Sequence, residues 1–356
     1  MTPSTLRFPS RCLTRVLLLL CMGSILGMAL AMAVPQNLGL WHVYPLVQLD
    51  ALPLIWILAL VSGTALGGVM LHSTPTSSAS TRTALKVLII LLICAVLVKG
   101  TQFLRAGGPL PVGLATVTTE TGNLTVLSFN ARDTEARDIA LAAADTSADA
   151  VLLVETNSDV ATGVVQRLQR QGVQSQAFMG SGTALQGEQQ VAIIVTETLG
   201  TYDEVPSPAL AFGAVTIAPR TSAAPAPESG ESRDPILSAV HPPAPFPGKV
   251  LASVWRQQLQ AAVAPCRQAA AIVGGDFNAS SRQVSHVMGS ECLHAGTQLG
   301  REAVGTWPTF IPAPLGASID HQIAHGGYWE PVGIEFMEIG RSDHRAVAVT
   351  YRALDS

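Results

Sequence analysis

The sequence has few charged side chains and few aromatic ones. Charged residues make up 13% of its 356 residues and aromatic residues 5%, whereas 48% are hydrophobic. The formal net charge is −4, so the chain has no excess of basic groups. A protein that binds a nucleic-acid backbone tightly normally presents a basic surface, together with aromatic side chains on which bases stack. The composition therefore argues against a stable nucleic-acid partner.

Cysteines at metal-binding spacing are also missing. The chain has five cysteines, and none stands in a CxxC or Cys/His zinc pattern. Cys266 and Cys292 are the only cysteines in the C-terminal part. We predict that they form a disulfide, because that part is expected in an oxidising compartment. The alternative is a pair of buried thiols.

Nearly all of the hydrophobic excess lies in three long apolar stretches near the N-terminus. They cover about residues 16–34, 51–71 and 84–104. Each is close to the ~20 residues that a helix needs to cross the hydrocarbon core of a bilayer. We therefore expect a membrane region with three transmembrane helices over residues 1–105, followed by a Gly/Pro/Thr-rich linker over residues 106–122.

The basic residues around these stretches predict an orientation. They precede the first stretch and follow the second: Arg7, Arg11, Arg15, Arg82 and Lys86. The positive-inside rule places both groups in the cytoplasm, so three crossings put the rest of the chain outside. Ala31-Met32-Ala33 is similar to a signal-peptidase site, and cleavage there would leave the same orientation. We expect a multi-pass protein of the cell membrane with an extracellular C-terminal domain.

Apolar strand-like runs alternate with helix-like segments over residues 123–356. The candidate strands are 124–129, 150–154, 190–196, 212–218, 236–240, 271–273, 318–324, 333–339 and 346–352. The candidate helices are 133–144, 160–171 and 249–263. This mixture over one domain-sized stretch predicts a single α/β or α+β domain with two packed sheets.

Acidic, amide and imidazole side chains stand at the ends of these strands, where layered α/β folds usually build their sites. In chain order they are Asn130, Glu155, His241, Asp276, Asn278, Asp320, His321, Asp343 and His344. Each of them alone has an ordinary structural explanation as a cap, turn or loop residue. Their order along one chain is more informative than any single residue.

This order resembles the endonuclease/exonuclease/phosphatase superfamily. The specific motifs are Gly275-Asp276-Phe277-Asn278 and Ser342-Asp343-His344, and Thr306-Trp307-Pro308 leading to Ile319-Asp320-His321 adds to the match. The resemblance implies a four-layer α/β/β/α sandwich of two packed mixed sheets and a metal-dependent phosphoric ester hydrolase. Apolar helices in front of such a domain are similar to the layout of a membrane-anchored bacterial branch, to which action on lipid-linked phosphates is attributed.

The resemblance also implies a metal site and a catalytic set. Asn130, Glu155 and Asp343 would bind Mg²⁺ or Mn²⁺, which prefer oxygen ligands.

Within the catalytic set, Asp276 would orient or deprotonate the attacking water and Asn278 would hold a phosphoryl oxygen. His241 and His344 would donate hydrogen bonds to the developing charge on phosphorus. Asp320 would orient His344 and keep it charged. His321 is left outside this set.

The predicted function is therefore a membrane-anchored phosphoesterase that hydrolyses a phosphodiester or phosphomonoester on the outer face, with a lipid-linked phosphate as one candidate substrate. One alternative is an extracellular nuclease. Another is a phosphate-binding domain without turnover, which would be expected to have lost a ligand residue. A transport or scaffold protein would place ionisable groups inside the apolar stretches, where only Asp50 and Lys99 come close.

Overall fold

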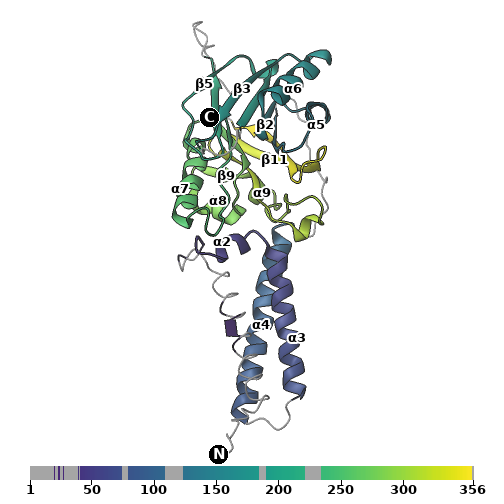
Figure 1. Ribbon diagram of the computed structural model, residues 1–356, viewed down its shortest axis with the longest axis vertical. Helices are drawn as coiled ribbons and strands as arrows, with labels where there is room; N and C mark the ends of the chain where they lie inside the picture. The colour runs from purple at the N-terminus through teal and green to yellow at the C-terminus, as the bar shows by residue number, and fades with distance from the viewer. Residues whose placement is uncertain are drawn as a thin grey trace, which may run out of the picture. The chain divides into compact units, whose positions relative to one another are not determined.

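The computed structural model describes two compact units (Figure 1). The described residues are 20, 23–24, 27, 39, 41–73, 79–108, 123–183, 190–220 and 234–354. One unit contains Met1–Trp41 and Pro53–Phe103, and the other contains His42–Leu52 and Leu104–Ser356. Most of the predicted first apolar helix and most of the predicted linker lie outside the described residues.

Two long apolar helices form the described part of the first unit. Helix α3 spans Pro53–Ser73 and helix α4 spans Ala79–Arg105. By length and composition both helices can cross a membrane. The described residues thus contain two candidate spans, whereas the sequence predicted three in the whole chain. The helices pack through the buried side chains of Leu60, Leu85 and Leu92.

The second unit is an α/β sandwich of two six-stranded mixed sheets. The first sheet has the order β11-β12-β1-β2-β4-β3, and only β1 and β2 pair in parallel. Its strands are β1 Leu124–Asn130, β2 Ala150–Thr156, β3 Ser175–Ser181, β4 Gln190–Thr196, β11 Trp329–Glu338 and β12 Arg345–Ala353.

The second sheet has the order β5-β6-β7-β8-β10-β9, and only β7 and β8 pair in parallel. Its strands are β5 Tyr202–Val205, β6 Ala214–Pro219, β7 Ile236–Val240, β8 Ala271–Asp276, β9 Cys292–His294 and β10 Asp320–His325. The two sheets therefore share one plan, with a central parallel pair flanked by antiparallel strands.

Helices cover the outer sides of the two sheets. Figure 1 shows α5 (Ala136–Asp145) and α6 (Ser158–Arg170) on one side of the domain, and α7 (Ala252–Val263) and α8 (Ser281–Val287) on another. The remaining described helices are short: α2 Leu46–Leu49, α9 Ala295–Gln298, η1 Glu197–Leu199, η2 Ala264–Arg267 and η3 Ala313–Leu315.

The apolar run of β2 shows why the sequence folds this way. Successive side chains of a strand point to opposite faces of its sheet. Ala150, Leu152 and Val154 enter the core between the two sheets, while Val151 and Leu153 enter the core beneath α5 and α6. A strand that is buried on both faces has to be apolar throughout, and this explains the unbroken run in the sequence.

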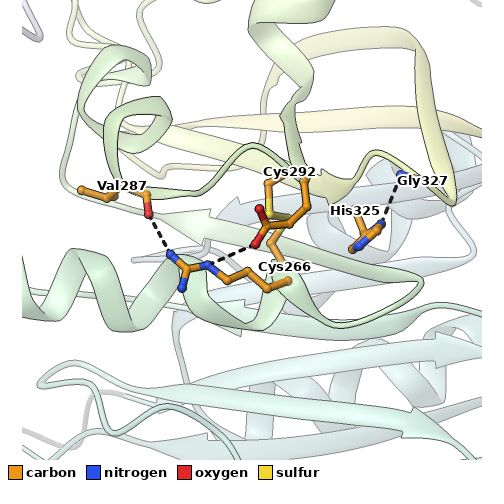
Figure 2. Close-up of a disulfide and its surroundings, with 7 residues drawn as sticks. Cys266, Val287, Cys292, His325 and Gly327 are labelled. Atoms are coloured by element: carbon orange, nitrogen blue, oxygen red, sulfur yellow. Dashed lines mark hydrogen bonds and ion pairs between the residues drawn. A yellow bond between two sulfur atoms is a disulfide. The ribbon is translucent and has the colours of Figure 1, made fainter.

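Cys266 and Cys292 are joined by a disulfide, with their Cα atoms 6.1 Å apart (Figure 2). The bond links η2, directly after α7, to the edge strand β9. Beside it, Arg267 Nε lies 3.5 Å from Glu291 Oε1. The structure thus contains the pair that the sequence predicted.

Candidate active site

The predicted polar residues meet at one edge of the sandwich. Strands β1, β2, β7 and β8 end there, and strands β10 and β12 begin there because each runs antiparallel to one of them. The parallel pair in each sheet brings two strand ends side by side. The two packed sheets therefore bring the strand ends from both halves of the chain together.

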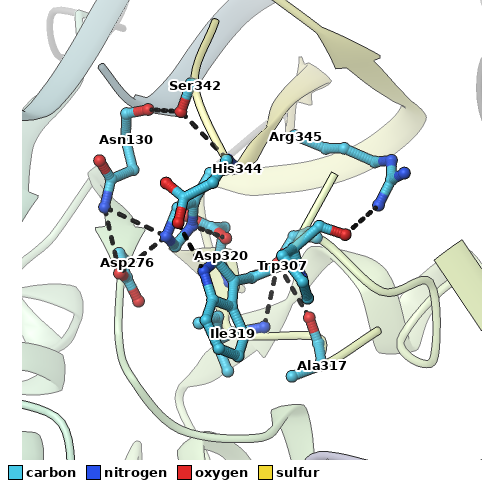
Figure 3. A network of polar contacts seen from close by, with 12 residues as sticks. Asn130, Asp276, Trp307, Ala317, Ile319, Asp320, Ser342, His344 and Arg345 are labelled. Carbon is cyan, nitrogen blue, oxygen red and sulfur yellow. Dashed lines mark hydrogen bonds and ion pairs between the residues drawn. The ribbon is translucent and has the colours of Figure 1, made fainter. Parts of the chain in front are cut away.

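Asn130, at the end of β1, lies at the centre of this cluster (Figure 3). Its Nδ2 atom lies 3.1 Å from Glu155 Oε1, 3.3 Å from Asp276 Oδ2 and 3.4 Å from His344 Nε2. Ser342 Oγ donates a 2.7 Å hydrogen bond to the Asn130 carbonyl and accepts one of 3.0 Å from the His344 backbone N–H. Ser342 thereby fixes the turn that carries His344 onto the end of β1.

Glu155 has an unusual backbone conformation for a strand residue. Its φ is +49°, and the pairing of β2 with β4 shifts register between Leu153 and Thr156. Such a bulge redirects a side chain, and a non-glycine residue at positive φ costs free energy that the surrounding structure must offset. Here the redirected carboxylate points to Asn130 and to His241, whose Nε2 lies 3.8 Å from Glu155 Oε1.

Asp276 is almost fully buried at the end of β8. Its Oδ2 lies 3.6 Å from His241 Nε2 and 3.8 Å from His344 Nε2, and its Oδ1 accepts a 2.9 Å hydrogen bond from the Asn278 backbone N–H. Burial alone would raise the pKa of Asp276. The two imidazoles and the backbone donor outweigh burial and hold that pKa below its ordinary value. The carboxylate is therefore ionised at neutral pH.

The close contact between Asp276 and His241 depends on Gly275. A Cβ at this position would lie 2.0 Å from the Val240 carbonyl oxygen, which is not possible without moving β7 or β8. His241 follows directly after Val240 and packs against the Phe212 ring, with 5.1 Å between ring centroids. The glycine of the Gly-Asp-x-Asn motif thus permits the close approach that brings imidazole and carboxylate together.

His344 and Asp320 form a buried ion pair. His344 Nδ1 lies 2.9 Å from Asp320 Oδ2, and Thr306 Oγ1 accepts a 3.1 Å hydrogen bond from the Asp320 backbone N–H. Burial disfavours a charged imidazole, but the nearby carboxylates, Asp320 above all, raise the pKa of His344 to about 10. At neutral pH His344 is a charged donor whose Nε2 faces Asp276 and Asn130.

Two other predicted residues, Asn278 and Asp343, and the neighbouring His321 make contacts outside this cluster. The Asn278 side chain, at φ +48°, donates a 3.0 Å hydrogen bond to the Pro242 carbonyl. Asp343 Oδ2 accepts a 2.9 Å hydrogen bond from Trp307 Nε1. His321, which was left outside the predicted set, has its Nε2 2.8 Å from the Ala279 carbonyl oxygen.

The donor set fits a divalent cation. Among the described residues, Glu155, His241 and Asp276 offer ligand atoms within 4.8 Å of one another, and so do Asp276, Asp320 and His344. Glu155 is the member of these groups that suits a metal best, because Asp276 lies beside both imidazoles and Asp320 and His344 already satisfy each other. Asn130 would bind the cation through its side-chain oxygen, which requires the amide oxygen and nitrogen to exchange positions. Asp343, which the sequence predicted as a metal ligand, belongs to neither group.

Several residues of the site were not predicted from the sequence. Arg132 Nη1 lies 3.9 Å from Glu155 Oε2, and the Trp307 ring lies 6.4 Å from the His344 ring. Thr306 and Ser342 hold the backbones of Asp320 and His344. Trp307, Thr306 and Ser342 belong to the sequence motifs that carry the family resemblance, so these motifs could have identified them as site residues. Arg132 had no signal beyond its place after Asn130.

Comparison with solved structures gives the fold. An endonuclease/exonuclease/phosphatase from Beutenbergia cavernae is 16% identical, with a TM-score of 0.51 over 65% of this chain and 72% of that one. A humanised Danio rerio TDP2 is 19% identical (TM-score 0.48; 65% and 100% covered), and the human Nocturnin catalytic domain is 16% identical (TM-score 0.46; 68% and 97% covered). A comparison with curated proteins finds no match.

The family follows from a direct match of the sequence. The model of the Endonuclease/Exonuclease/phosphatase family matches residues 126–344, more than half of the chain, and this range contains every member of the cluster described above. The chain therefore belongs to the endonuclease/exonuclease/phosphatase family of metal-dependent phosphoric ester hydrolases.

Proposed function

We propose that this chain is a membrane-anchored phosphoesterase that cleaves a phosphodiester or phosphomonoester on the outer face of the membrane, with a lipid-linked phosphate as its substrate class. The observation that carries the proposal is the intact cluster of Asn130, Glu155, His241, Asp276 and the Asp320–His344 pair. A binding domain without turnover would be expected to have lost at least one of these groups.

Asp276, His344 and His241 would have different roles in hydrolysis. Asp276 is ionised and buried, so it orients the attacking water and accepts its proton as the new oxygen–phosphorus bond forms. The ester oxygen–phosphorus bond breaks in the same reaction, and the leaving oxygen takes a proton from solvent. His344, charged through Asp320, donates from Nε2 to a phosphoryl oxygen, and His241 donates from its own Nε2, which also lies beside Asp276 Oδ2. Both donors are held in place before the reaction, which is what makes such groups effective in a buried site.

Glu155 and Asn130 would hold a divalent cation, with Mg²⁺ or Mn²⁺ as the best match to oxygen ligands. When bound there, the cation supplies charge neutralisation for the phosphate and a template for its position. Asp343 remains a proposed ligand, although its carboxylate accepts a hydrogen bond from Trp307.

Membrane anchoring is supported by the exposure of the apolar helices. Only 28% of the most apolar window of α3 and 17% of that of α4 is buried, whereas the core helix of a soluble domain is mostly buried. His42–Leu52 and Leu104–Ser356 belong to one compact unit and must lie on the same side of a membrane. Helices α3 and α4 would then cross as a hairpin, as the predicted topology requires.

The outer face is supported by the disulfide between Cys266 and Cys292. Disulfides persist mainly in oxidising compartments outside the cytoplasm. The basic residues that flank the apolar stretches favour the same orientation.

A lipid-linked substrate is supported by the tether and by charge. A domain anchored by apolar helices meets membrane lipids at high local concentration, and the net charge of −4 offers no basic surface for a polynucleotide.

The test is a substrate screen on the purified full-length chain with Mg²⁺ or Mn²⁺. The probes are bis(p-nitrophenyl) phosphate, p-nitrophenyl phosphate, a polyprenyl pyrophosphate and labelled single-stranded DNA. Turnover of the polyprenyl compound above the others is expected, and His344→Ala and Asp276→Asn should each lose roughly 10²–10³ in rate. Preferred cleavage of DNA would make the chain a nuclease. Turnover that survives His344→Ala in a folded protein would refute the mechanism.

A further inference from the structure

A short segment between the first two predicted apolar stretches folds as part of the catalytic unit. His42–Leu52 belongs with Leu104–Ser356, although α3 and α4 separate the two in sequence. The segment contains only the single-turn helix α2, which is too short to be stable by itself in water. Its conformation is therefore set by its contacts with the domain.

The Asp50 carboxylate makes the first of these contacts. Its side chain is only 7% exposed, its Oδ2 accepts a 2.6 Å hydrogen bond from Ser280 Oγ, and its Oδ1 lies 3.5 Å from Arg282 Nη1. A buried carboxylate is costly unless it is paired and hydrogen-bonded. Both partners come from the start of α8, where Ser280 is the N-cap residue. Ser280 follows two positions after Asn278 in the Gly-Asp-x-Asn motif.

The buried side-chain amide of Gln283, in the first turn of α8, makes the second contact. Gln283 Nε2 donates a 2.8 Å hydrogen bond to the Val47 carbonyl. Its Oε1 accepts a 2.8 Å hydrogen bond from the Ser280 backbone N–H, which completes the capping box of α8. One side chain therefore links the segment to the loop that leaves Asp276.

The segment also holds the loop that follows His241. Gln48 Nε2 donates a 2.9 Å hydrogen bond to the Pro245 carbonyl, and the Tyr44 hydroxyl donates to the Val250 carbonyl. The two loops are joined to each other, because Asn278 Nδ2 donates to the Pro242 carbonyl at 3.0 Å. The segment thus contacts both loops that carry the chain away from His241 and Asp276.

We propose that His42–Leu52 is a positioning element of the active site, in which Asp50 and Gln48 hold these two loops without contacting substrate. The catalytic consequence rests on the proposed phosphoesterase function, whereas the structural consequence does not. Helix α3 begins at Pro53, directly after the segment in the sequence.

Replacing Asp50 by alanine removes the acceptor of the Ser280 Oγ–H and the carboxylate that faces the Arg282 guanidinium. The loop with Asn278 should then shift or fluctuate. Because small displacements of catalytic groups are costly, kcat should fall roughly 10- to 100-fold, with a much smaller change in KM. Asp50→Asn keeps an acceptor for Ser280 but removes the charge facing Arg282, so it should fall between the parent and Asp50→Ala.

Asp149 offers a matched control. Its Oδ2 accepts a 2.9 Å hydrogen bond from the Thr125 backbone N–H and its Oδ1 accepts one of 3.0 Å from Thr198 Oγ1. It directly precedes β2, at the opposite end of that strand from Glu155. Asp149→Ala removes the same kind of double acceptor far from the site, so it should lower the melting temperature and leave kcat unchanged.

The experiment uses the full-length chain in detergent, with two readouts. One is kcat and KM for bis(p-nitrophenyl) phosphate with Mg²⁺ or Mn²⁺, and the other is backbone hydrogen exchange over residues 243–250 and 278–284. We expect faster exchange in both loops and a lower kcat for Asp50→Ala, and neither change for Asp149→Ala. Should Asp50→Ala fail to fold, Gln48→Ala replaces it. That variant removes the hydrogen bond to the Pro245 carbonyl, and its effect is read from exchange over residues 243–250.

The two readouts separate this inference from the proposed function. If the parent turns over none of the probes, the proposed function fails, and hydrogen exchange alone then decides whether the segment holds the loops. Unchanged exchange in Asp50→Ala overturns the inference, and so does faster exchange with a parental kcat in an active enzyme.

Discussion

Replacing Asp320 by asparagine should move the alkaline limit of activity. His344 Nδ1 lies 2.9 Å from Asp320 Oδ2 in a buried site. At an effective dielectric constant near 20, a pair of charges this close attracts by roughly 5 kcal/mol, which corresponds to ~4 pKa units. That magnitude agrees with a His344 pKa raised to about 10 against the opposing effect of burial. Without the charge, the pKa of His344 should fall to ~6.5 or below.

Activity should fall with rising pH because the protonated, charged form of His344 is the active one. The parent keeps His344 protonated up to pH about 10. Asp320→Asn should lose activity as pH rises through ~6.5. At pH ~8.5 its kcat/KM should be about 100-fold below that of the parent, and near pH ~6 the difference in kcat/KM between parent and variant should be smaller. The assay is the pH profile of kcat/KM with an aryl phosphodiester. Parallel profiles for parent and variant would show that Asp320 does not act through the charge of His344.

Three further predictions follow from other parts of the structure. Glu155→Gln removes the negative charge of the carboxylate that we propose as the main metal ligand, so activity should fall at least ~10-fold and partly recover at high Mg²⁺ or Mn²⁺. An unchanged metal dependence would place the metal elsewhere. Cys266 and Cys292 should take up an alkylating reagent only after reduction, as read by mass spectrometry; labelling without reductant would argue against the bond. Alkaline phosphatase fused after Ser356 should be active if the domain lies outside, and an inactive fusion would reverse the orientation.

The strands that the sequence did not predict share a place in the fold. β3, β5 and β9 each lie at the edge of a sheet. An edge strand buries less of its surface than a central one, so its sequence needs no apolar run; β3 is at most half-buried along its length. By contrast, the central strands β1, β2, β7 and β8 are buried almost throughout and were visible in the sequence. β11 was predicted to start too late because a register shift between Pro331 and Gly333 interrupts its pattern.

The site was predictable to the extent that it stands at the ends of central strands. Asn130, Glu155, His241 and Asp276 follow strongly apolar runs, so their convergence follows from the two parallel strand pairs. Hydrogen bonds between distant segments leave no comparable pattern. The Ser342 contact with the Asn130 carbonyl spans 212 residues, and the Asp50 contact with Ser280 spans 230. In the sequence Asp50 is only a charge at the edge of an apolar stretch.

Two of the site residues, Glu155 and Asn278, have a backbone conformation at positive φ that residues other than glycine rarely adopt. Asp133, Ser147 and Ala270 adopt positive φ in connections between elements, where such a conformation is an ordinary turn feature. Asn278 also adopts it in a connection, between β8 and α8, whereas Glu155 adopts it inside a strand. A glycine at either position would relieve strain but remove the carboxylate or the amide. The retained side chains are therefore better explained by what they hold in the site than by the stability of the fold.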